Sequence, residues 1–218
     1  SGSGSHNFNN LTVAASQVSF SATSITLSGN LSTISSGSFS QASGGTLLMT
    51  GTSKTITGSG ILLDNFSVSG SVTTTTSFSI AGNMFVSGTL LASSGTIQMT
   101  GTSKTISGSG SKTFNTLFIS GAITTTADLT ISAVLNVSGS LTASSGTTTF
   151  TGASSLSGIA NLYNATINGT SLQLSSNAVL GIANALPITA GTLDITTSYP
   201  NTVNFNGTGA QNINAIAY

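Results

Sequence analysis

One segment of the chain occurs twice, and this duplication limits the folds that the chain can adopt. Residues 45–60 are GTLLMTGTSKTITGSG and residues 95–110 are GTIQMTGTSKTISGSG, so 13 of 16 positions are identical. A near-copy about 50 residues downstream is the signature of a repeat architecture. We therefore expect repeated structural units rather than one irregular globular core.

Four units of about 50 residues can be aligned along the 218 residues. Each opens with an apolar residue, a polar pair and an alternating segment: FNNLTV at 8–13, LDNFSV at 63–68, FNTLFI at 114–119 and LYNATI at 162–167. The predicted units are 8–62, 63–113, 114–161 and 162–212 of a single domain, with a partial unit at each end.

The apolar residues alternate with polar ones, which predicts short β-strands with one buried face. Helix signals are nearly absent, because the chain has neither Glu nor Arg and is rich in β-branched residues. Residues 48, 98, 149 and 194 are expected to face solvent. Their neighbours in the duplicated strand are expected to point inward: Leu47 and Met49, Ile97 and Met99, Thr148 and Phe150, Leu193 and Ile195.

Two all-β architectures fit such strands: a row of sandwiches and a solenoid. A unit of about 50 residues is short for a sandwich, and its repeated positions favour stacking of one unit on the next. We predict a right-handed parallel β-solenoid, or β-helix, of about four repeats. Each repeat would form two coils of about 20–25 residues, and equivalent positions would stack in ladders along a rod of about 40 Å.

The composition excludes several classes of partner. Lysines and aspartates number three each and arginine is absent, so the chain lacks the basic patch of a nucleic-acid-binding protein and any polybasic attraction to lipid. The most apolar stretch, 178–190, contains Asn184 and Pro187 and is too short to span a bilayer. We predict no nucleic-acid binding and no membrane insertion.

The segments FNNLTV (8–13), SGTL (87–90) and TISGSG (105–110) resemble the degenerate repeats of large secreted bacterial surface proteins. Adhesins of the filamentous-haemagglutinin type and autotransporter passengers have similar repeats, and the resemblance covers nearly all of the chain. It implies a right-handed parallel β-helix, an extracellular or cell-surface location and an adhesive or structural role. It supplies no catalytic residues.

Neither end of the sequence shows a polar capping repeat, so both terminal coils would expose strand edges and apolar side chains. We predict head-to-tail association between copies of the chain, which gives an open fibre. The alternative is that the 218 residues are one segment of a longer polypeptide. The contact would join Phe8, Leu11 and Val13 of one copy to Ile213, Ile216 and Tyr218 of the next.

No catalytic, metal or cofactor site is predicted, and the chain is not expected to be an enzyme. The three aspartates, Asp64, Asp128 and Asp194, occupy different phases of the repeat and do not form a catalytic pair. His6 aligns with Lys112 at a repeat position that we expect to be exposed. Lys54 and Lys104 share another repeat position, also expected on an exposed coil face.

Modification and ligand binding at the surface are open possibilities. Ser and Thr make up 78 of the 218 residues, and flat Thr ladders can bind ice, although a Thr-x-Thr motif in every coil is absent. Seven sequons permit N-glycosylation, at Asn10, Asn30, Asn65, Asn136, Asn164, Asn168 and Asn206.

The sequence therefore predicts a structural subunit or repeat segment of an extracellular filament or surface fibre. The second hypothesis is an adhesin stalk or a module that binds carbohydrate or a host surface. An ice-binding solenoid is the third.

Overall fold

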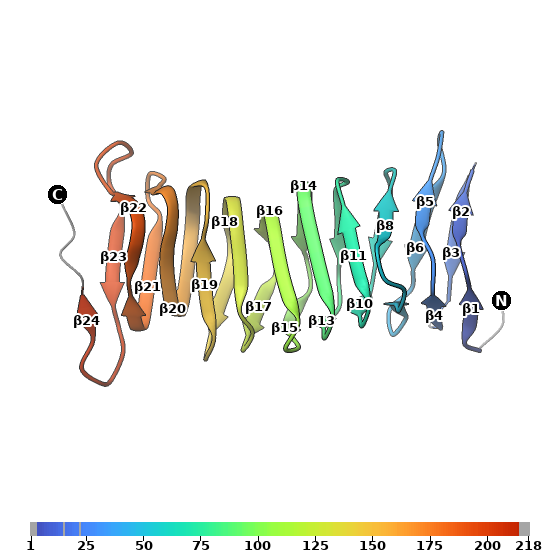
Figure 1. Ribbon diagram of the computed structural model, residues 1–218, viewed down its shortest axis with the longest axis horizontal. Coiled ribbons are helices and arrows are strands. Elements are labelled where there is room, and N and C mark those ends of the chain that lie inside the picture. The colour runs from blue at the N-terminus through green and yellow to red at the C-terminus, as the bar shows by residue number, and fades with distance from the viewer. Residues whose placement is uncertain (1–3, 15, 22, 214–218) are drawn as a thin grey trace.

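The computed structural model is a rod of stacked β-strands that describes residues 4–14, 16–21 and 23–213. Every described strand pair is parallel, and none of these residues lies in a helix. The two ends of the chain lie at opposite ends of the rod (Figure 1). The predicted parallel β-solenoid is confirmed as the fold class.

Each coil, meaning one complete circuit of the chain, contributes one strand segment to each of three faces. On face A the inward residues stack as His6, Ile25, Leu47, Phe66, Met84, Ile106, Thr125 and Ala143. On face B they stack as Leu11, Leu31, Ile56, Thr74, Ala92, Phe114, Ile131, Phe150, Ile167 and Ile188. On face C they include Phe78, Ile97, Leu117, Leu135 and Leu156.

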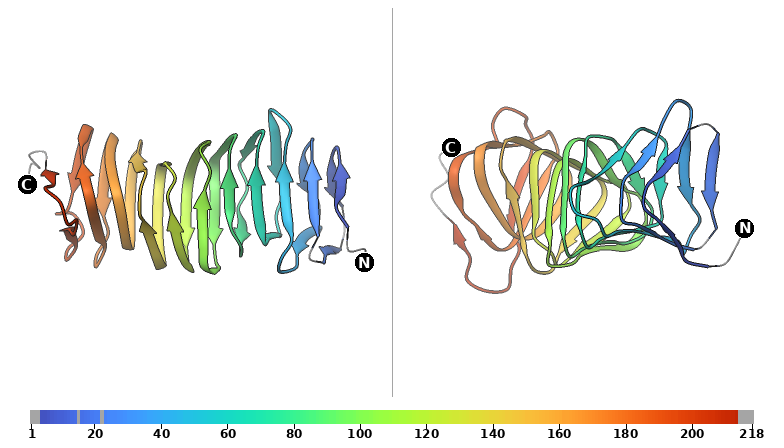
Figure 2. Two further views of the ribbon diagram at one scale, coloured as in Figure 1. Left: turned by 90° about the horizontal axis from the view of Figure 1, so that it is seen from below. Right: turned by 45° about the vertical axis from the view of Figure 1, so that its right-hand side comes forward.

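Stacked residues are between 17 and 27 positions apart, as the pairs Leu63–Ile80 and Leu186–Ile213 show. The chain therefore makes about 10 turns. At ~4.8 Å per turn the rod is roughly 48 Å long, which is longer than expected because most coils need only about 20 residues. Two further views of the stacked coils are given in Figure 2.

The first strands of the chain are short and each lies on one face. The face A strands are β1 (His6–Phe8), β4 (Ser24–Leu27), β7 (Thr46–Met49), β10 (Asn65–Val68), β13 (Met84–Val86), β15 (Thr102–Ser107) and β17 (Ala122–Thr125). The face B strands are β2 (Leu11–Val13), β5 (Leu31–Thr33), β8 (Lys54–Thr57), β11 (Ser71–Thr74) and β19 (Thr147–Phe150). The face C strands are β3 (Gln17–Phe20), β6 (Ser38–Gln41), β9 (Ile61–Leu63) and β12 (Phe78–Ile80).

The later strands are longer and continue around the corners between faces. They are β14 (Thr89–Met99), β16 (Ser111–Ile119), β18 (Leu129–Ala143), β20 (Ala153–Leu174), β21 (Val179–Leu186) and β22 (Ile188–Asp194). The last two strands are β23 (Thr202–Phe205) on face A and β24 (Asn212–Ile213) on face B.

The core is a dry column of aliphatic and aromatic side chains inside the three faces. Leu47, Met49, Ile97, Met99 and Phe150 are all fully buried, as the alternation predicted. Of the eight inward residues predicted for the duplicated strand, Ile195 alone is half-buried. The reason is its position in the last coil on face C.

The duplicated segments do not stack on each other. Leu47 lies on face A, whereas its counterpart Ile97 lies on face C and the third counterpart, Thr148, lies on face B. From Leu47 to Ile97 the chain passes through eight strand segments, B, C, A, B, C, A, B and C. Over the first three copies one repeat is therefore two coils and two further faces, so each of these copies is turned by one face relative to the previous one. The fourth counterpart, Leu193, lies on face C, seven strand segments after Thr148. The predicted ladders of equivalent positions are wrong for this reason.

The shared TGTSKTI sequence forms the same corner on two different pairs of faces. Ser53 and Ser103 have positive φ angles of 54° and 57° at the turn. A Cβ atom on Gly51 would lie 2.0 Å from the Ser28 carbonyl oxygen and 2.7 Å from Cε of Lys54, so glycine is required there. Lys54 covers this glycine with its aliphatic stem, and it is half-buried rather than on an exposed face as predicted.

Candidate functional site

Both ends of the rod leave apolar inward side chains partly uncovered. In the middle of the rod each inward residue is covered by the coils before and after it, and its exposure is close to zero. Tyr163 is half-buried within the rod. The other half-buried hydrophobic residues that pack against the core belong to the first and last described coils: Phe8, Leu11, Val18, Phe20, Ile188, Ile195, Val203 and Phe205.

The three residues predicted at the N-terminal end lie together in the first coil. Phe8 in β1 and Leu11 in β2 are half-buried, whereas Val13 in β2 is only 2% exposed. Phe8 and Leu11 therefore offer surface to a partner, and Val13 already belongs to the core.

An aromatic group at this end was missed by the sequence analysis. The ring of His6 lies 6.2 Å from that of Phe8 and 6.0 Å from that of Phe20, and Phe20 lies 5.6 Å from Phe39. His6 points inward and is half-buried, which corrects the prediction of an exposed position. The alternation in the QVSF segment, 17–20, was the available signal.

At the C-terminal end, the backbone of Ile213 lies in β24 and pairs with Leu186. Ile216 and Tyr218 lie outside the described residues. Val203 and Phe205 in β23 also lie at this end, with half-buried side chains stacked on Leu180 and Ile182 of β21. Like His6, Phe205 belongs to the inward stack of face A.

Lys112 is a buried lysine in the middle of the rod, although its repeat position was predicted to be exposed. It is 2% exposed and stacks between Leu90 and Leu129 on the inner side of face B. Its Nζ donates hydrogen bonds to the carbonyl oxygens of Gly108 (2.6 Å) and Gly110 (2.8 Å). Burial lowers the pKa of Lys112, and the negative charge of Asp128 opposes this effect.

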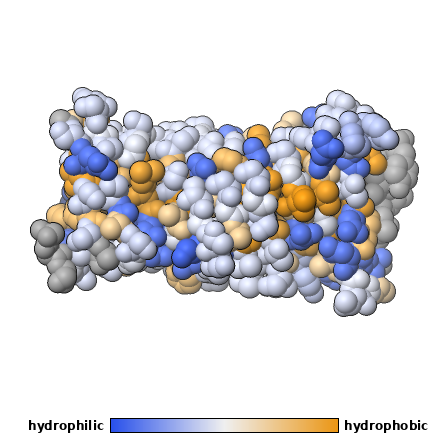
Figure 3. All heavy atoms as spheres, turned by 180° about the vertical axis from the view of Figure 1, so that it is seen from behind, coloured by the Kyte–Doolittle hydropathy of each residue, from blue (hydrophilic) through white to orange (hydrophobic). Residues whose placement is uncertain are grey.

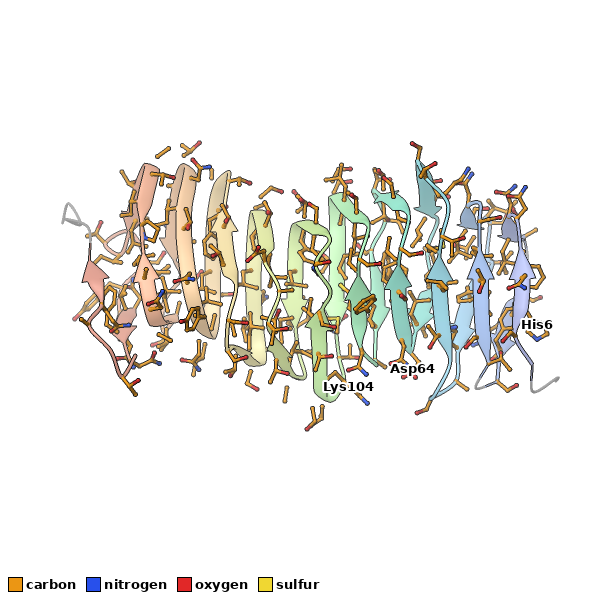
Figure 4. The ribbon with its side chains drawn as sticks, turned by 60° about the horizontal axis from the view of Figure 1, so that its bottom comes forward. His6, Asp64 and Lys104 are labelled. Carbon is orange, nitrogen blue, oxygen red and sulfur yellow. The ribbon has the colours of Figure 1, made fainter. Side chains whose placement is uncertain are left out.

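The three aspartates serve turns and lie far apart. Asp64 accepts a hydrogen bond from the Gly44 backbone (2.7 Å), and Asp128 accepts one from the Thr147 backbone (2.8 Å). Asp64, Asp128 and Asp194 are separated by about three coils each, on the order of 14 Å along the axis. This is too far for a pair of catalytic carboxylates. In Figure 4, Asp64 and Lys104 lie at the edge of the rod, and His6 lies near its N-terminal end.

The described part of the surface carries shallow depressions. Three of them have volumes of 130, 180 and 270 Å³, below the usual range for a small-molecule site. Among the residues that the structure describes, no three His, Cys, Asp or Glu side chains lie close enough to hold a metal ion. No helix in this part of the chain is long and apolar enough to cross a membrane.

No protein-family model, curated protein or solved structure matches this chain. The likeness to β-helical repeats therefore stands on the fold.

The seven asparagines of the sequons fall into three groups. The Nδ2 atoms of Asn65, Asn164 and Asn206 donate hydrogen bonds to oxygen atoms of the chain, so a glycan there would replace a structural contact. The carboxamide oxygens of Asn10 and Asn30 accept bonds from the backbone of the next coil, at 2.8 and 2.9 Å. Asn168 is exposed and Asn136 is half-buried.

Proposed function

We propose that this chain is a non-enzymatic structural module of an extracellular fibre or cell-surface protein, in which the rods join end to end. The observation that supports the proposal is the position of the half-buried apolar side chains. Among the described residues, the half-buried apolar side chains that pack against the core belong to the first and last described coils, with the exception of Tyr163.

The two ends continue the same three stacks, so one subunit can be placed on the next in register. His6 and Phe205 end the stack on face A, and placing one subunit on the next would bring their neighbourhoods together. The free N–H and C=O groups of the terminal strands could then pair as they do inside the rod. The two surfaces differ, so the contact is heterologous and repeats without closing, which produces a filament.

The expected affinity is modest. Eight half-exposed apolar side chains, at about 1 kcal/mol each on burial, supply on the order of 8 kcal/mol. Association costs about 4–15 kcal/mol in lost freedom of movement. Hydrogen bonds between the strand edges must supply the remainder. Assembly is therefore expected to be reversible and to depend on the concentration of protein.

Two variants test the contact, each with a lysine at one end. Leu11→Lys charges the N-terminal coil, and Val203→Lys charges the C-terminal coil. Each variant alone should stay monomeric by analytical ultracentrifugation, and a mixture of the two should form dimers only, because one intact surface remains on each partner. The control is Phe85→Lys, which changes an outward residue of face A that is 47% exposed. This variant should assemble like the wild type.

Electron microscopy of the concentrated wild type should show filaments with the width of one rod. A wild type that is monomeric at every concentration would refute the proposal. Filaments formed by either end variant alone would also refute it, because the introduced lysine should prevent that terminal coil from being buried against another subunit. Circular dichroism confirms that each variant keeps its strands.

A further inference from the structure

The outer side of face B carries a threonine in six of seven successive coils. The outward residues pair from strand to strand as Thr55, Thr73, Leu91, Thr113, Thr130, Thr149 and Thr166. These threonines come from different phases of the repeat, and only Thr55, Thr73 and Thr149 lie in Thr-x-Thr segments, so no regular motif identifies the row in the sequence. We call this row the threonine ladder.

The hydroxyl groups of the ladder are free to bond with water. Among the described residues, none of the six threonine hydroxyls has a hydrogen-bond partner in the protein. Inward threonines behave differently: Thr74 donates to the Ile56 carbonyl oxygen, and Thr125 donates to that of Ala127. The ladder threonines are half-buried, except for the exposed Thr55.

A second row of polar side chains runs beside the ladder. Two residues before each ladder position lie Ser71, Thr89 and Ser111, which pair in succession, and farther along Thr147 pairs with Asn164. Neighbouring positions are ~4.8 Å apart between coils and roughly 6.7 Å apart along a strand. Face B thus presents a two-dimensional grid of hydroxyl groups. Asp128 is the charged residue that lies between Ser111 and Thr147 in the second row.

The grid is rigid before any ligand binds. Its backbone is hydrogen-bonded to the coils on both sides, and a β-branched threonine has few χ1 rotamers. A rigid array loses little conformational freedom on binding. Water molecules bound to such a grid are held at regular intervals, close to the oxygen spacing in hexagonal ice.

The other two faces are less regular. Face A has a shorter row of three stacked threonines, Thr105, Thr124 and Thr142, beside an outward row that contains large apolar side chains. Face A carries Leu48 and Phe85 two coils apart in one outward row. Face C carries Leu62 and Phe118 in a row with Gln98. Figure 3, a view of one side of the rod, shows hydrophobic patches set among residues of intermediate hydropathy.

We infer that face B is an ice-binding surface. A flat hydroxyl grid without a pocket has no means of selecting a small molecule, and it offers no aromatic anchor to a protein partner. A crystal of water matches its flatness, its regular spacing and its hydrogen-bonding groups. The inference does not depend on end-to-end assembly.

The test measures incorporation of fluorescently labelled protein into a growing ice hemisphere, together with thermal hysteresis. The wild type should be incorporated into the ice and should lower the temperature at which ice crystals grow. Replacing Thr130→Tyr and Thr149→Tyr together should abolish both effects, because two rings in adjacent coils lift the grid off a flat crystal. Leu91→Thr completes the ladder and should increase the hysteresis.

The matched control replaces two exposed threonines in adjacent coils of face A, Thr124→Tyr and Thr142→Tyr. This control should bind ice like the wild type, and so should Leu11→Lys, which separates ice binding from assembly. Exclusion of the wild type from the ice would overturn the inference. Full incorporation of the face B double variant, or loss of incorporation in the face A control, would overturn it as well. Circular dichroism shows whether each variant is folded.

Discussion

Because the ammonium group of Lys112 is buried, the free energy of unfolding of the rod should vary with pH in the alkaline range. Burial lowers the pKa of Lys112 in the folded chain below its ordinary value of 10.5. Between the folded and the unfolded pKa the unfolded chain therefore binds more protons, so stability rises with pH. The gain is at most about 1.4 kcal/mol per pH unit and ends near pH 10.5, where the unfolded lysine also loses its proton.

The substitution Lys112→Met removes the charge and keeps most of the stem. It gives up two hydrogen bonds to the carbonyl oxygens of Gly108 and Gly110, worth about 1.5–3 kcal/mol each for a charged donor. It also removes the desolvation cost of a buried ion, which is several kcal/mol. We expect the two terms nearly to cancel at neutral pH. Lys112→Ala lacks the stem too and should be about 2–5 kcal/mol less stable than the Met variant.

The assay is urea unfolding followed by far-ultraviolet circular dichroism, at pH values from 7 to 10.5. The difference in unfolding free energy between the wild type and Lys112→Met isolates the contribution of the lysine, because the two proteins share all other titrating groups. This difference should shift in favour of the wild type as the pH rises. Equal pH dependence of the two proteins would refute a buried ammonium. Asp128→Asn, which removes the charge that opposes the pKa shift, should extend the effect to lower pH.

Two further predictions concern turns. Gly158 has a φ of 76°, and a Cβ atom there would lie 1.6 Å from the Val137 carbonyl oxygen, so Gly158→Ala should destabilise by about 3 kcal/mol or more in thermal unfolding. The control Gly209→Ala, with nothing within 4 Å, should stay within about 0.5 kcal/mol of the wild type. Hydrogen bonds from the side chain and backbone of Thr197 and from Thr196 lower the pKa of Asp194 to about 2. The stabilisation of this turn is therefore present above about pH 3.8 and lost as the pH falls through 2. Carboxyl NMR should report that pKa, and a value near 3.8 would contradict the turn geometry.

The local structure could be predicted from the sequence because it depends on neighbouring residues. Alternation alone identified Leu47, Met49, Ile97 and Phe150 as inward side chains, and all are fully buried. The fold class followed from the repeat, because a unit of about 50 residues is short for a sandwich and its repeated positions favour stacking.

The arrangement of the coils could not be predicted, because it depends on how many strands complete a circuit. The duplicated sequence does not reveal that eight strand segments separate Leu47 from Ile97. Its copies were therefore expected to stack on each other. The same gap concealed the threonine ladder, whose members become neighbours only through the strand register. The burial of Lys112 was missed because its aligned positions are occupied by different residue types.

The turn of one face between successive repeats has a consequence for how such a chain can lengthen. Duplicating or deleting a whole unit keeps the rod continuous but rotates everything downstream by one third of a circuit. Rows of outward side chains would then be interrupted at the new junction, whereas the apolar core would remain continuous. Three units of eight strand segments each, or eight full circuits, would restore the original orientation. The gain or loss of three such units at a time would thus keep a functional face continuous. The gain or loss of one unit would move the downstream part of that face to another side of the rod.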